Sequence, residues 1–568
     1  MSIRTIPSIF RNIPVIRAES ENSENSEVAV ELPAPTTNKS ENVSLTEKSG
    51  LRLSSILANL SVEQRSVVES VLSGRSLFFT GCAGTGKSFT LKSLTAAIRA
   101  TTGSAQGIFF TAMTGVAASL LPGATTLHTF AGIGQGEGNL DLLVGRVKRN
   151  KLALRNWGSA RILVIDEVSM LSRRLFEVLD RVGRNIRKND SPFGGIQLVL
   201  CGDFFQLPPV SKDFKNARTP TPAEIELANL DKQMCFESPI WNSVIKEHIV
   251  LRKVFRQQDL GLVNLLNEVR FNSISEKNIK LLKSLCRPLV CPPGITPTIL
   301  TPFNAKADTI NQGRLDALPE KPVSTHQQTY QQTYQQTNQQ IETKEEGGDP
   351  LYYGKYTYTA RDSGADEFMR QNIDKLTCYP KVLTLKVGAQ VMMLKNNSAL
   401  SLVNGSCGVV EGFRLSESVD RDKVEVLESV KCPGNSMLPV VRFANGVVAT
   451  IGIEAFTVED AVNPSLPPRA KRDQIPLRLA WAVTIHKAQG MTIDYLQVDV
   501  RNVFEAGQAY VALSRARSVE GLQVLSFDEK KFWCDPKVVN FYKTTVDAQN
   551  RSDAMINSSP QLKRTRCD

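Results

Sequence analysis

The segment Gly81–Ser88 reads G-x-x-x-x-G-K-S and directly follows the apolar run Leu77–Phe79. Glycines in this pattern let backbone N–H groups close around phosphate oxygens, Lys87 brings a positive charge to the β- and γ-phosphates, and the Ser88 hydroxyl can ligate Mg²⁺. The helical pattern of Phe89–Ile98 places the phosphates at a helix N-terminus. We therefore predict that ATP and Mg²⁺ bind here. Kinases, GTPases, transporters and motors all use such a loop.

The residues of this loop that we predict to bind nucleotide are Gly81, Cys82, Ala83, Gly84, Thr85, Gly86, Lys87 and Ser88.

Composition narrows the class of protein. The chain has 568 residues, enough for two to four domains that each bury a core. Its net charge is +11, and because the first 50 residues contribute −2, the remainder carries +13. This charge fits a polyanionic partner, although moderate basicity also aids solubility.

The ten cysteines form no C-x-x-C pair, which favours a reducing compartment over secretion and argues against a zinc site. No apolar run approaches the length of a membrane span.

Four short apolar runs predict the strands of a first sheet: Leu77–Phe79, Ile108–Phe110, Ile162–Ile165 and Ile196–Leu200. Helical stretches separate these runs, which is typical of a parallel α/β sheet buried on both faces. Ligands of such sheets bind at the carboxyl ends of the strands.

A second, discontinuous α/β region is expected from Thr298–Leu300, Leu496–Val500 and Leu522–Phe527, with helices around Leu262–Leu285. Short alternating segments between Leu385 and Ile453, separated by Gly and Asn turns, predict a small β-barrel inserted into this region. Upstream of it, residues 326–340 repeat a QQT unit, which is typical of a disordered loop.

Two further strands of the first sheet end in residues that suit ATP hydrolysis. Asp166 and Glu167 follow Ile162–Ile165, and such a pair can hold the Mg²⁺ shell and deprotonate the attacking water, respectively. Gln206 follows the fourth strand, and its amide can bridge the attacking water or the γ-phosphate to a neighbouring element. Combined with the phosphate loop, this arrangement predicts an ATPase.

Three longer segments resemble one family. Pro192–Cys201, Gly202–Val210 and Pro476–Gly490 are similar to the PIF (petite integration frequency) helicases, superfamily 1B motors related to RecD that unwind DNA in the 5′→3′ direction. The likeness runs from about Leu60 to Phe527. It implies two RecA-like lobes with parallel sheets, with a small SH3-like β-barrel inserted in the second lobe.

The resemblance also implies roles for single residues. Gln64 falls in the family's adenine-reading element, while Arg256 and Arg515 fall in its fourth and sixth motifs. Phosphoryl transfer builds negative charge on the equatorial oxygens, and a fixed guanidinium stabilises this charge better than a flexible ammonium. We therefore expect both arginines to act as arginine fingers supplied by the second lobe. Arg517 serves the DNA or an internal ion pair.

Other matched motifs hold single-stranded DNA in the family. The resemblance implies DNA contacts for Thr114, Thr126, His128, Thr484, His486, Gln508, Tyr510 and Ser514. For the two histidines, coupling of the lobes is an alternative role.

The expected division of the chain combines these observations. It comprises a disordered leader with a possible targeting role at 1–50, a first RecA-like lobe at 51–235, a second lobe in two parts at 236–320 and 471–545, a largely disordered Gln-rich insertion at 321–380, a small β-barrel at 381–470, and a disordered tail at 546–568.

The expected function is that of an ATP-dependent DNA helicase in genome maintenance, a monomer that acts on single-stranded and forked DNA. An RNA helicase of the same superfamily and an ATPase clamp that does not unwind are the alternatives. Arg4, Arg11 and Arg17 in an acid-free N-terminal segment suggest a mitochondrial address, with a plain disordered tail as the alternative, and Lys563–Arg566 suggests a nuclear one.

Overall fold

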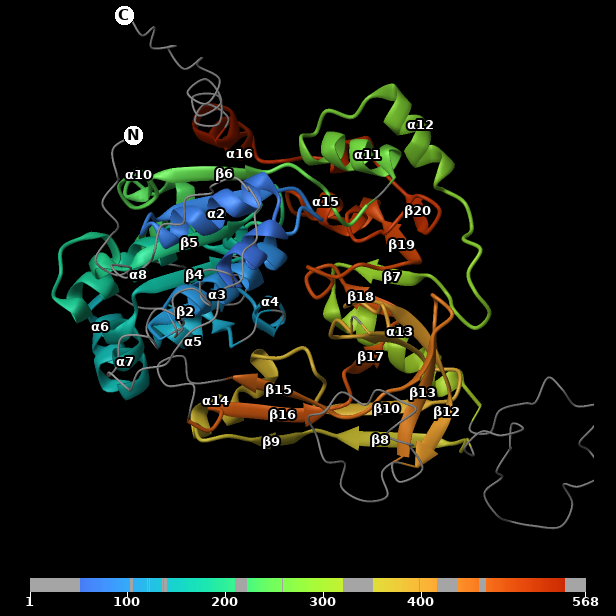
Figure 1. Ribbon diagram of the computed structural model, residues 1–568. Helices are drawn as coiled ribbons and strands as arrows, with labels where there is room; N and C mark the ends of the chain where they lie inside the picture. Colours follow the sequence, from blue (N-terminus) through green and yellow to red (C-terminus); the bar gives the residue numbers. More distant parts are fainter. Residues whose placement is uncertain are drawn as a thin grey trace, which may run out of the picture.

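The computed structural model describes residues 52–102, 106–119, 121, 123–134, 136, 140–209, 222–257, 259–319, 351–397, 399–415, 437–458 and 466–546. Figure 1 shows two α/β lobes side by side and a strand-rich module below both of them. None of the described helices is long and apolar enough to cross a membrane.

The first lobe is built on a six-stranded sheet in the order β3-β2-β4-β5-β1-β6, in which every pairing is parallel. Its strands are β1 (Leu77–Gly81), β2 (Ile108–Ala112), β3 (Thr125–Thr126), β4 (Ile162–Asp166), β5 (Gln197–Gly202) and β6 (Glu247–Leu251). The residues of β1, β2, β4 and β5 are buried throughout, because helices cover both faces. This explains the continuous apolar runs of the sequence.

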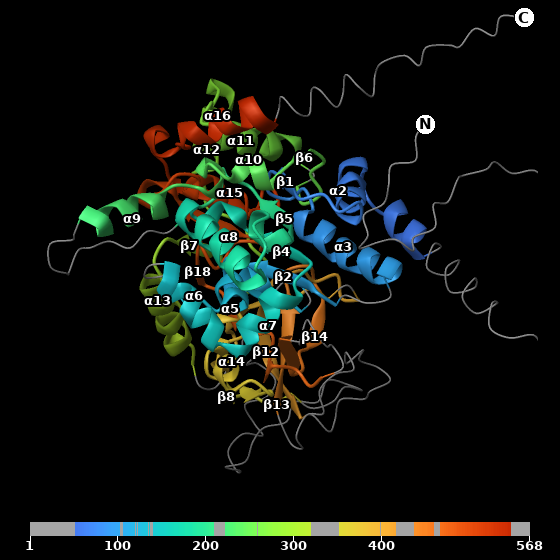
Figure 2. The same ribbon diagram turned by 90° about the vertical axis from the view of Figure 1, so that its left-hand side faces the viewer.

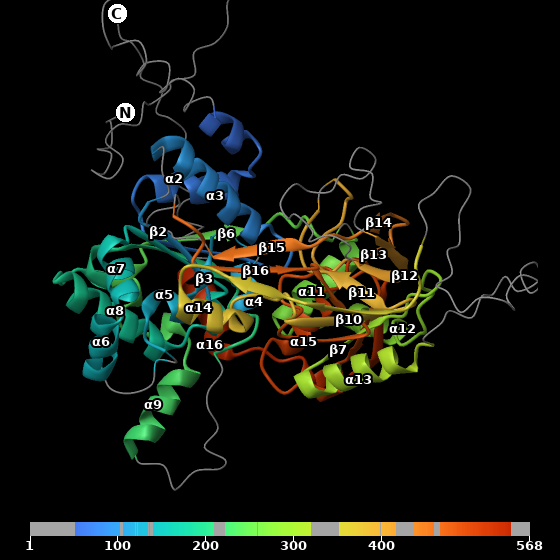
Figure 3. The same cartoon turned by 90° about the horizontal axis from the view of Figure 1, so that it is seen from below.

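Neighbouring residues of a strand point to opposite faces of this sheet. Phe79 belongs to the cluster that contains Val67 of α2 and Leu91 of α3, whereas Phe78 lies in the cluster on the other face and contacts the rings of Phe204 and Trp241. The helices of this lobe are α2 (Val62–Leu72), α3 (Lys87–Thr102), α4 (Gly115–Ser119), α5 (Leu127–Ala131), α6 (Leu140–Arg149), α7 (Lys151–Ser159), α8 (Arg173–Arg187), α9 (Pro222–Lys232) and α10 (Trp241–Val244). Figures 2 and 3 show α9 standing out from the body of the protein.

The second lobe has a four-stranded parallel sheet in the order β18-β7-β19-β20. Its strands are β7 (Thr298–Thr301), β18 (Ala482–Thr484), β19 (Leu496–Asp499) and β20 (Leu522–Ser526), and its helices are α11 (Leu260–Arg270), α12 (Glu276–Ser284), α13 (Asn304–Ala317) and α15 (Gln508–Leu513). Strands that lie about 180 residues apart in the chain pair here, so the lobe is discontinuous as expected.

The inserted module consists of antiparallel sheets. Its elements are β8 (Lys355–Thr359), β9 (Arg361–Ser363), α14 (Glu367–Gln371), β10 (Val382–Lys386), β11 (Gln390–Met393), β12 (Cys407–Leu415), β13 (Met437–Phe443), β14 (Val448–Thr450), β15 (Glu454–Val458), β16 (Ala470–Gln474) and β17 (Leu477–Leu479). The five-stranded sheet has the order β14-β13-β12-β11-β17 and does not close on itself within the described residues, so it does not confirm the barrel.

The last described segment returns to the first lobe. It comprises α16 (Pro536–Phe541) and the π-helix η8 (Tyr542–Val546). The Phe541 ring stacks on Phe236 at 4.3 Å between centroids and also contacts Trp241 and Phe78. The first lobe therefore takes part of its core from the end of the chain.

These strands confirm the predicted mixed α/β architecture with two lobes, but the predicted division of the chain is wrong in four places. The first lobe extends beyond residue 235, because β6 pairs with β1 at the edge of its sheet. Residues 351–380, predicted to be largely disordered, form β8, β9 and α14. Residues 471–479 belong to the module, and 536–546 pack on the first lobe. Residues 1–51, 321–350 and 547–568 lie outside the described part.

Candidate nucleotide site between the two lobes

The phosphate loop joins β1 to α3 and forms the first wall of the site. Gly84 and Gly86 have φ values of +88° and +81°, a left-handed conformation that glycine adopts without strain. A Cβ atom at Gly84 would lie 2.7 Å from Arg256 Cβ, and one at Gly86 would lie 2.7 Å from Gln64 Nε2. Glycine is therefore required both by the turn and by the neighbours that pack on it.

Lys87 and Gln64 hold the loop from within. Lys87 Nζ donates to the carbonyl oxygens of Gly81 at 2.7 Å and Cys82 at 3.2 Å. Gln64 is buried, its Oε1 accepts from the Ser61 backbone N–H at 3.1 Å, and its Nε2 donates to the Thr85 carbonyl at 3.4 Å. Because Nε2 carries a second N–H and Oε1 a second lone pair, these two bonds leave the amide able to contact adenine. The role of Gln64 in adenine reading stays a prediction.

The two acids lie where β4 ends beside the loop. Glu167 takes a left-handed conformation with φ +55°, and its backbone N–H donates to Asp166 Oδ1 at 2.9 Å. Burial raises the pKa of both carboxyls, and the charge of Asp166 adds to this effect on Glu167. The pKa of Glu167 rises to about 7, although Lys87, Arg515 and a hydrogen bond lower it. A carboxylate with this pKa can accept a proton near neutral pH.

That hydrogen bond comes from the second lobe. Gln489 Nε2 donates to Glu167 Oε2 at 2.8 Å and so fixes the carboxylate that we predict to be the base. No role was predicted for Gln489, and the available sequence signal was its place within Pro476–Gly490, one of the segments that resemble the family.

Arg256 and Arg515 reach the site from the far side. Arg256 Nη1 and Nη2 donate to the carbonyls of Ser514 at 3.3 Å and Gly490 at 3.1 Å. Arg515 is buried, with its Nε bonded to the Val511 carbonyl at 2.9 Å. Burial and the neighbouring Arg515 charge lower the pKa of Arg256 to about 9. Because the two guanidinium groups repel each other, an anion between them and the loop would be favourable.

The loop, Glu167 and the two arginines line one cavity of about 780 Å³, whereas Gln64, Asp166 and Gln489 are not among its lining residues. The predicted residues that line it are Ala83, Gly84, Thr85, Gly86, Lys87, Ser88, Glu167, Gln206, Arg256 and Arg515. The backbone N–H groups of Phe255 and Arg256 donate to the Gly84 carbonyl at 2.8 and 3.3 Å, so the loop and the arginine segment touch directly. The structure thus brings residues from both lobes into one site.

Arg517 also lines the cavity, while its Nε bonds Asp494 Oδ1 at 2.7 Å. This contact matches the internal ion pair that was one of its two expected roles.

The residues predicted to hold Mg²⁺ fit that ion. Ser88 offers a hydroxyl in the cavity wall, and Asp166 ends β4, which β5 separates from β1, with a buried carboxylate. Mg²⁺ in nucleotide sites takes one or two such protein oxygens and completes its shell with water and phosphate oxygens.

The predicted DNA-binding residues divide into two groups. Thr114, Thr126, His128 and His486 are partly exposed. Thr484, Gln508, Tyr510 and Ser514 are buried, so the structure contradicts direct DNA contact for these four. The Tyr510 hydroxyl accepts from the Ala83 backbone N–H at 2.8 Å, and the Ser514 hydroxyl bonds Arg515 Nη2 at 2.6 Å. The sixth motif therefore builds the nucleotide site and not a DNA surface.

A second cavity of about 630 Å³ lies between α13, the module and the first lobe. Its lining includes Gly115, Asn311, Tyr379, Arg478 and Lys487. Burial lowers the pKa of both basic side chains, which makes an anionic partner favourable there. Tyr379, Arg478 and the module wall were not among the predicted binding residues.

Comparison with known proteins agrees with this geometry. Residues 59–274 match the model of the PIF1-like helicase family, and residues 370–413 match that of the 2B domain of the DNA helicase Pif1. The chain is 37% identical to the ATP-dependent DNA helicase PIF1 of Rattus norvegicus over 90% of its own length and 70% of the relative. The chain belongs to the PIF1-like helicase family. The predicted resemblance is thereby confirmed.

Two further comparisons show how much of its relatives' length this chain covers. The crystal structure of the Pif1 helicase from Candida albicans is 37% identical, has a TM-score of 0.59 and matches 85% of this chain and 99% of that one. The human ATP-dependent DNA helicase PIF1 is 38% identical over 87% of this chain. The chain spans 65% of that relative's length, just under two thirds. The two lobes and the module are therefore a PIF1-like core.

Proposed function

We propose that this PIF1-like chain is an ATP-dependent DNA helicase that moves 5′→3′ on single-stranded DNA and unwinds duplexes. The observation that carries the proposal is the composite site: Arg515 of the second lobe, and Arg256 in the segment that joins β6 to α11, line the same cavity as the phosphate loop of the first lobe. Such a site is complete only when the lobes are closed, so hydrolysis is coupled to lobe motion.

Each part of the site has a role in hydrolysis. Glu167 orients the attacking water and accepts its proton, and Gln489 holds this carboxylate in place. Gln206 lines the cavity at the end of β5 and senses the γ-phosphate. Arg256 and Arg515 stabilise the charge that builds on the equatorial oxygens. Ser88 and Asp166 would hold Mg²⁺, which when bound offsets the charge of the phosphate oxygens.

The second cavity is the proposed path of the DNA strand. It is bounded by Gly115 of the first lobe, by α13 and by the module, so it touches every part that moves in the cycle. Arg478 and Lys487 supply charge for phosphates, and Tyr379 is the one aromatic residue among the described lining residues. Contacts to phosphates with base stacking give sequence-tolerant, salt-sensitive binding. His128, His486, Thr114 and Thr126 remain proposed contacts near this path.

The test is ATP hydrolysis measured with single-stranded DNA, with RNA of the same sequence and without nucleic acid. Strong stimulation by DNA alone supports the proposal, whereas equal or stronger stimulation by RNA supports an RNA helicase. Stimulation without strand displacement on a 5′-tailed duplex supports a clamp that does not unwind.

The place of action is part of the proposal. Action on genomic DNA implies the nucleus, the mitochondrion or both, and a monomer is the expected form. Imaging of tagged chains with and without residues 1–20 separates the two compartments.

A further inference from the structure

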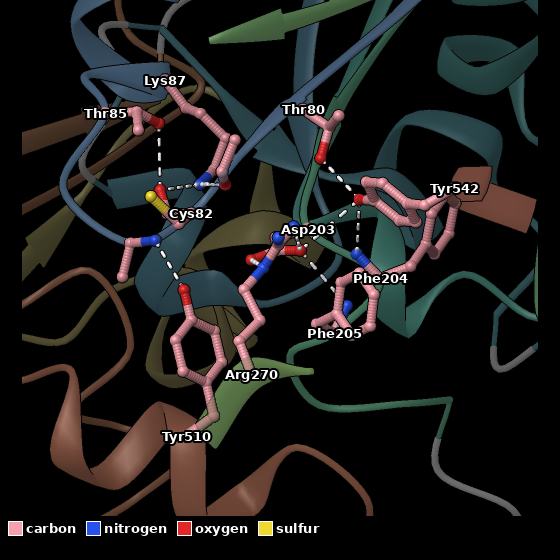
Figure 4. A network of polar contacts seen from close by, with 12 residues as sticks. Thr80, Cys82, Thr85, Lys87, Asp203, Phe204, Phe205, Arg270, Tyr510 and Tyr542 are labelled. Atoms are coloured by element: carbon pink, nitrogen blue, oxygen red, sulfur yellow. Dashed lines mark hydrogen bonds and ion pairs between the residues drawn. The ribbon is translucent and has the colours of Figure 1, made fainter. Parts of the chain in front are cut away.

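A buried polar network joins the phosphate loop to parts of the chain that hold no nucleotide. Figure 4 shows Asp203 at its centre, between Arg270, Tyr542 and the backbone of Phe204 and Phe205. Asp203 follows β5 directly and is fully buried. No step of the proposed hydrolysis uses this carboxylate, although Gln206 lies three residues away.

Arg270 connects Asp203 to the second lobe. It is the last residue of α11, and its Nη2 and Nε donate to the two Asp203 oxygens at 2.7 and 3.1 Å. The guanidinium lies 4.3 Å from the Phe205 ring centroid and 5.3 Å from that of Tyr542. Lysine could not replace this residue, because only a planar guanidinium can bind a carboxylate in bidentate fashion and stack on aromatic rings at the same time. Because removal of one partner leaves a buried charge unpaired, this joint resists opening.

Tyr542 connects the same centre to the end of the chain and to β1. Its hydroxyl lies 2.6 Å from Thr80 Oγ1, donates to Asp203 Oδ1 at 3.4 Å and accepts from the Phe204 N–H at 3.4 Å. Thr80 immediately precedes Gly81, and the Gly81 carbonyl oxygen accepts a hydrogen bond from the Lys87 ammonium. The Tyr542 hydroxyl thus connects β1, which leads into the phosphate loop, to Asp203, the carboxylate that holds the segment carrying Gln206.

The network fixes Gln206 as well. Its backbone N–H donates to the Asp203 carbonyl at 2.8 Å, and the Phe205 N–H donates to Asp203 Oδ1 at 3.2 Å. The turn that carries Gln206 into the cavity is therefore tied to Asp203 through both its backbone and its side chain.

We propose that Arg270 and Tyr542 are positioning residues of the ATPase. Arg270 joins the second lobe to Asp203, and Tyr542 joins the C-terminal segment to Asp203 and Thr80. Together they hold Gln206 and the phosphate loop in the relative position that hydrolysis needs. This inference rests on the proposed ATPase. It assigns the segment 536–546 a role in coupling: the segment keeps the base of the site closed while the arginine side opens and closes. Neither residue touches the cavity, so each acts through its neighbours.

The test is Tyr542→Phe, which removes one hydroxyl and keeps the ring and its packing. We expect the kcat of DNA-stimulated ATP hydrolysis to fall about three- to tenfold, while the KM for ATP changes less than about twofold. Thr80→Val removes the partner hydroxyl, so the double variant should be no slower than the slower single variant. Arg270→Lys keeps the charge but loses the paired geometry, and we expect a larger fall in kcat.

Tyr358→Phe is the matched control, because the Tyr358 hydroxyl is buried without a hydrogen-bond partner among the described residues. A kcat of Tyr542→Phe within twofold of wild type overturns the proposal. Equal losses in Tyr358→Phe, or losses in the Thr80 and Tyr542 variants that multiply, also overturn it. If wild type itself hydrolyses no ATP with DNA, the proposed function fails first, so the two failures are distinguishable.

Discussion

The pH dependence of ATP hydrolysis should report the protonation of Glu167. Burial and the charge of Asp166 raise the pKa of Glu167 to about 7. The carboxylate accepts a proton only when it is ionised, so activity should rise with pH and be lost as pH falls through about 7. We expect kcat/KM, measured with saturating DNA and Mg²⁺, to show an acid limb centred there.

Gln489→Leu should move this limb. The Gln489 amide donates to Glu167 Oε2 at 2.8 Å and stabilises the ionised form. A hydrogen bond to a charged group contributes about 1.5 kcal/mol, which corresponds to roughly one pKa unit. At pH 7 the ionised fraction would fall from about one half to about one tenth, a roughly fivefold loss of rate. At pH 8.5 the variant should approach wild type to within about 1.5-fold.

The assay is steady-state ATP hydrolysis from pH 6 to pH 8.5 for wild type, Gln489→Leu and a control. Gln497→Leu is the control, because Gln497 donates to Gln523 in β19 and β20, away from the cavity. A loss in Gln489→Leu that is equal at every pH would refute the reasoning, since it would show misplacement of Glu167 and not a changed pKa. A flat wild-type profile would remove Glu167 as the base.

Three further predictions test other parts of the site. Arg515→Ala should retain ATP affinity within a few-fold and lower kcat about a thousandfold, as measured by nucleotide binding and steady-state turnover, and normal turnover would remove it as a finger. Gly84→Ala should weaken ATP binding about tenfold in calorimetry, because its φ is +88° and the new Cβ would lie 2.7 Å from Arg256 Cβ; unchanged affinity would contradict this packing. Arg478→Ala should weaken single-stranded DNA binding and reduce the slope of log K against log salt by about one, whereas an unchanged slope would place the phosphates elsewhere.

The residues that the first lobe contributes to the site were predictable, because each of them belongs to a short segment whose own sequence indicates its role. The phosphate loop, the acids after β4 and Gln206 after β5 each follow a short apolar run that ends at the same edge of the sheet. Physical chemistry assigns these residue types to phosphate, metal and water without a relative. The second wall was different: Arg256 and Arg515 were found only through family resemblance, since single arginines carry no local signal.

Contacts that cross the chain could not be read from the sequence. Tyr542 and Thr80 are 462 residues apart, and Arg270 and Asp203 are 67 apart. No periodicity connects such pairs. β6 was missed for a related reason, because its run contains Glu247 and His248 and takes its place from pairing with β1. The buried state of Tyr510 reflects its bond to Ala83, which only the packed lobes reveal.

The most direct test of the composite ATP-driven motor is strand displacement on matched duplexes with a 5′ or a 3′ single-stranded tail. Wild type with ATP should separate the 5′-tailed duplex and leave the 3′-tailed one paired. Glu167→Gln should bind ATP and the tail but separate neither. Displacement of the 3′-tailed duplex alone, of neither duplex by wild type, or of the 5′-tailed duplex by Glu167→Gln would contradict a 5′→3′ motor driven by hydrolysis between these two lobes.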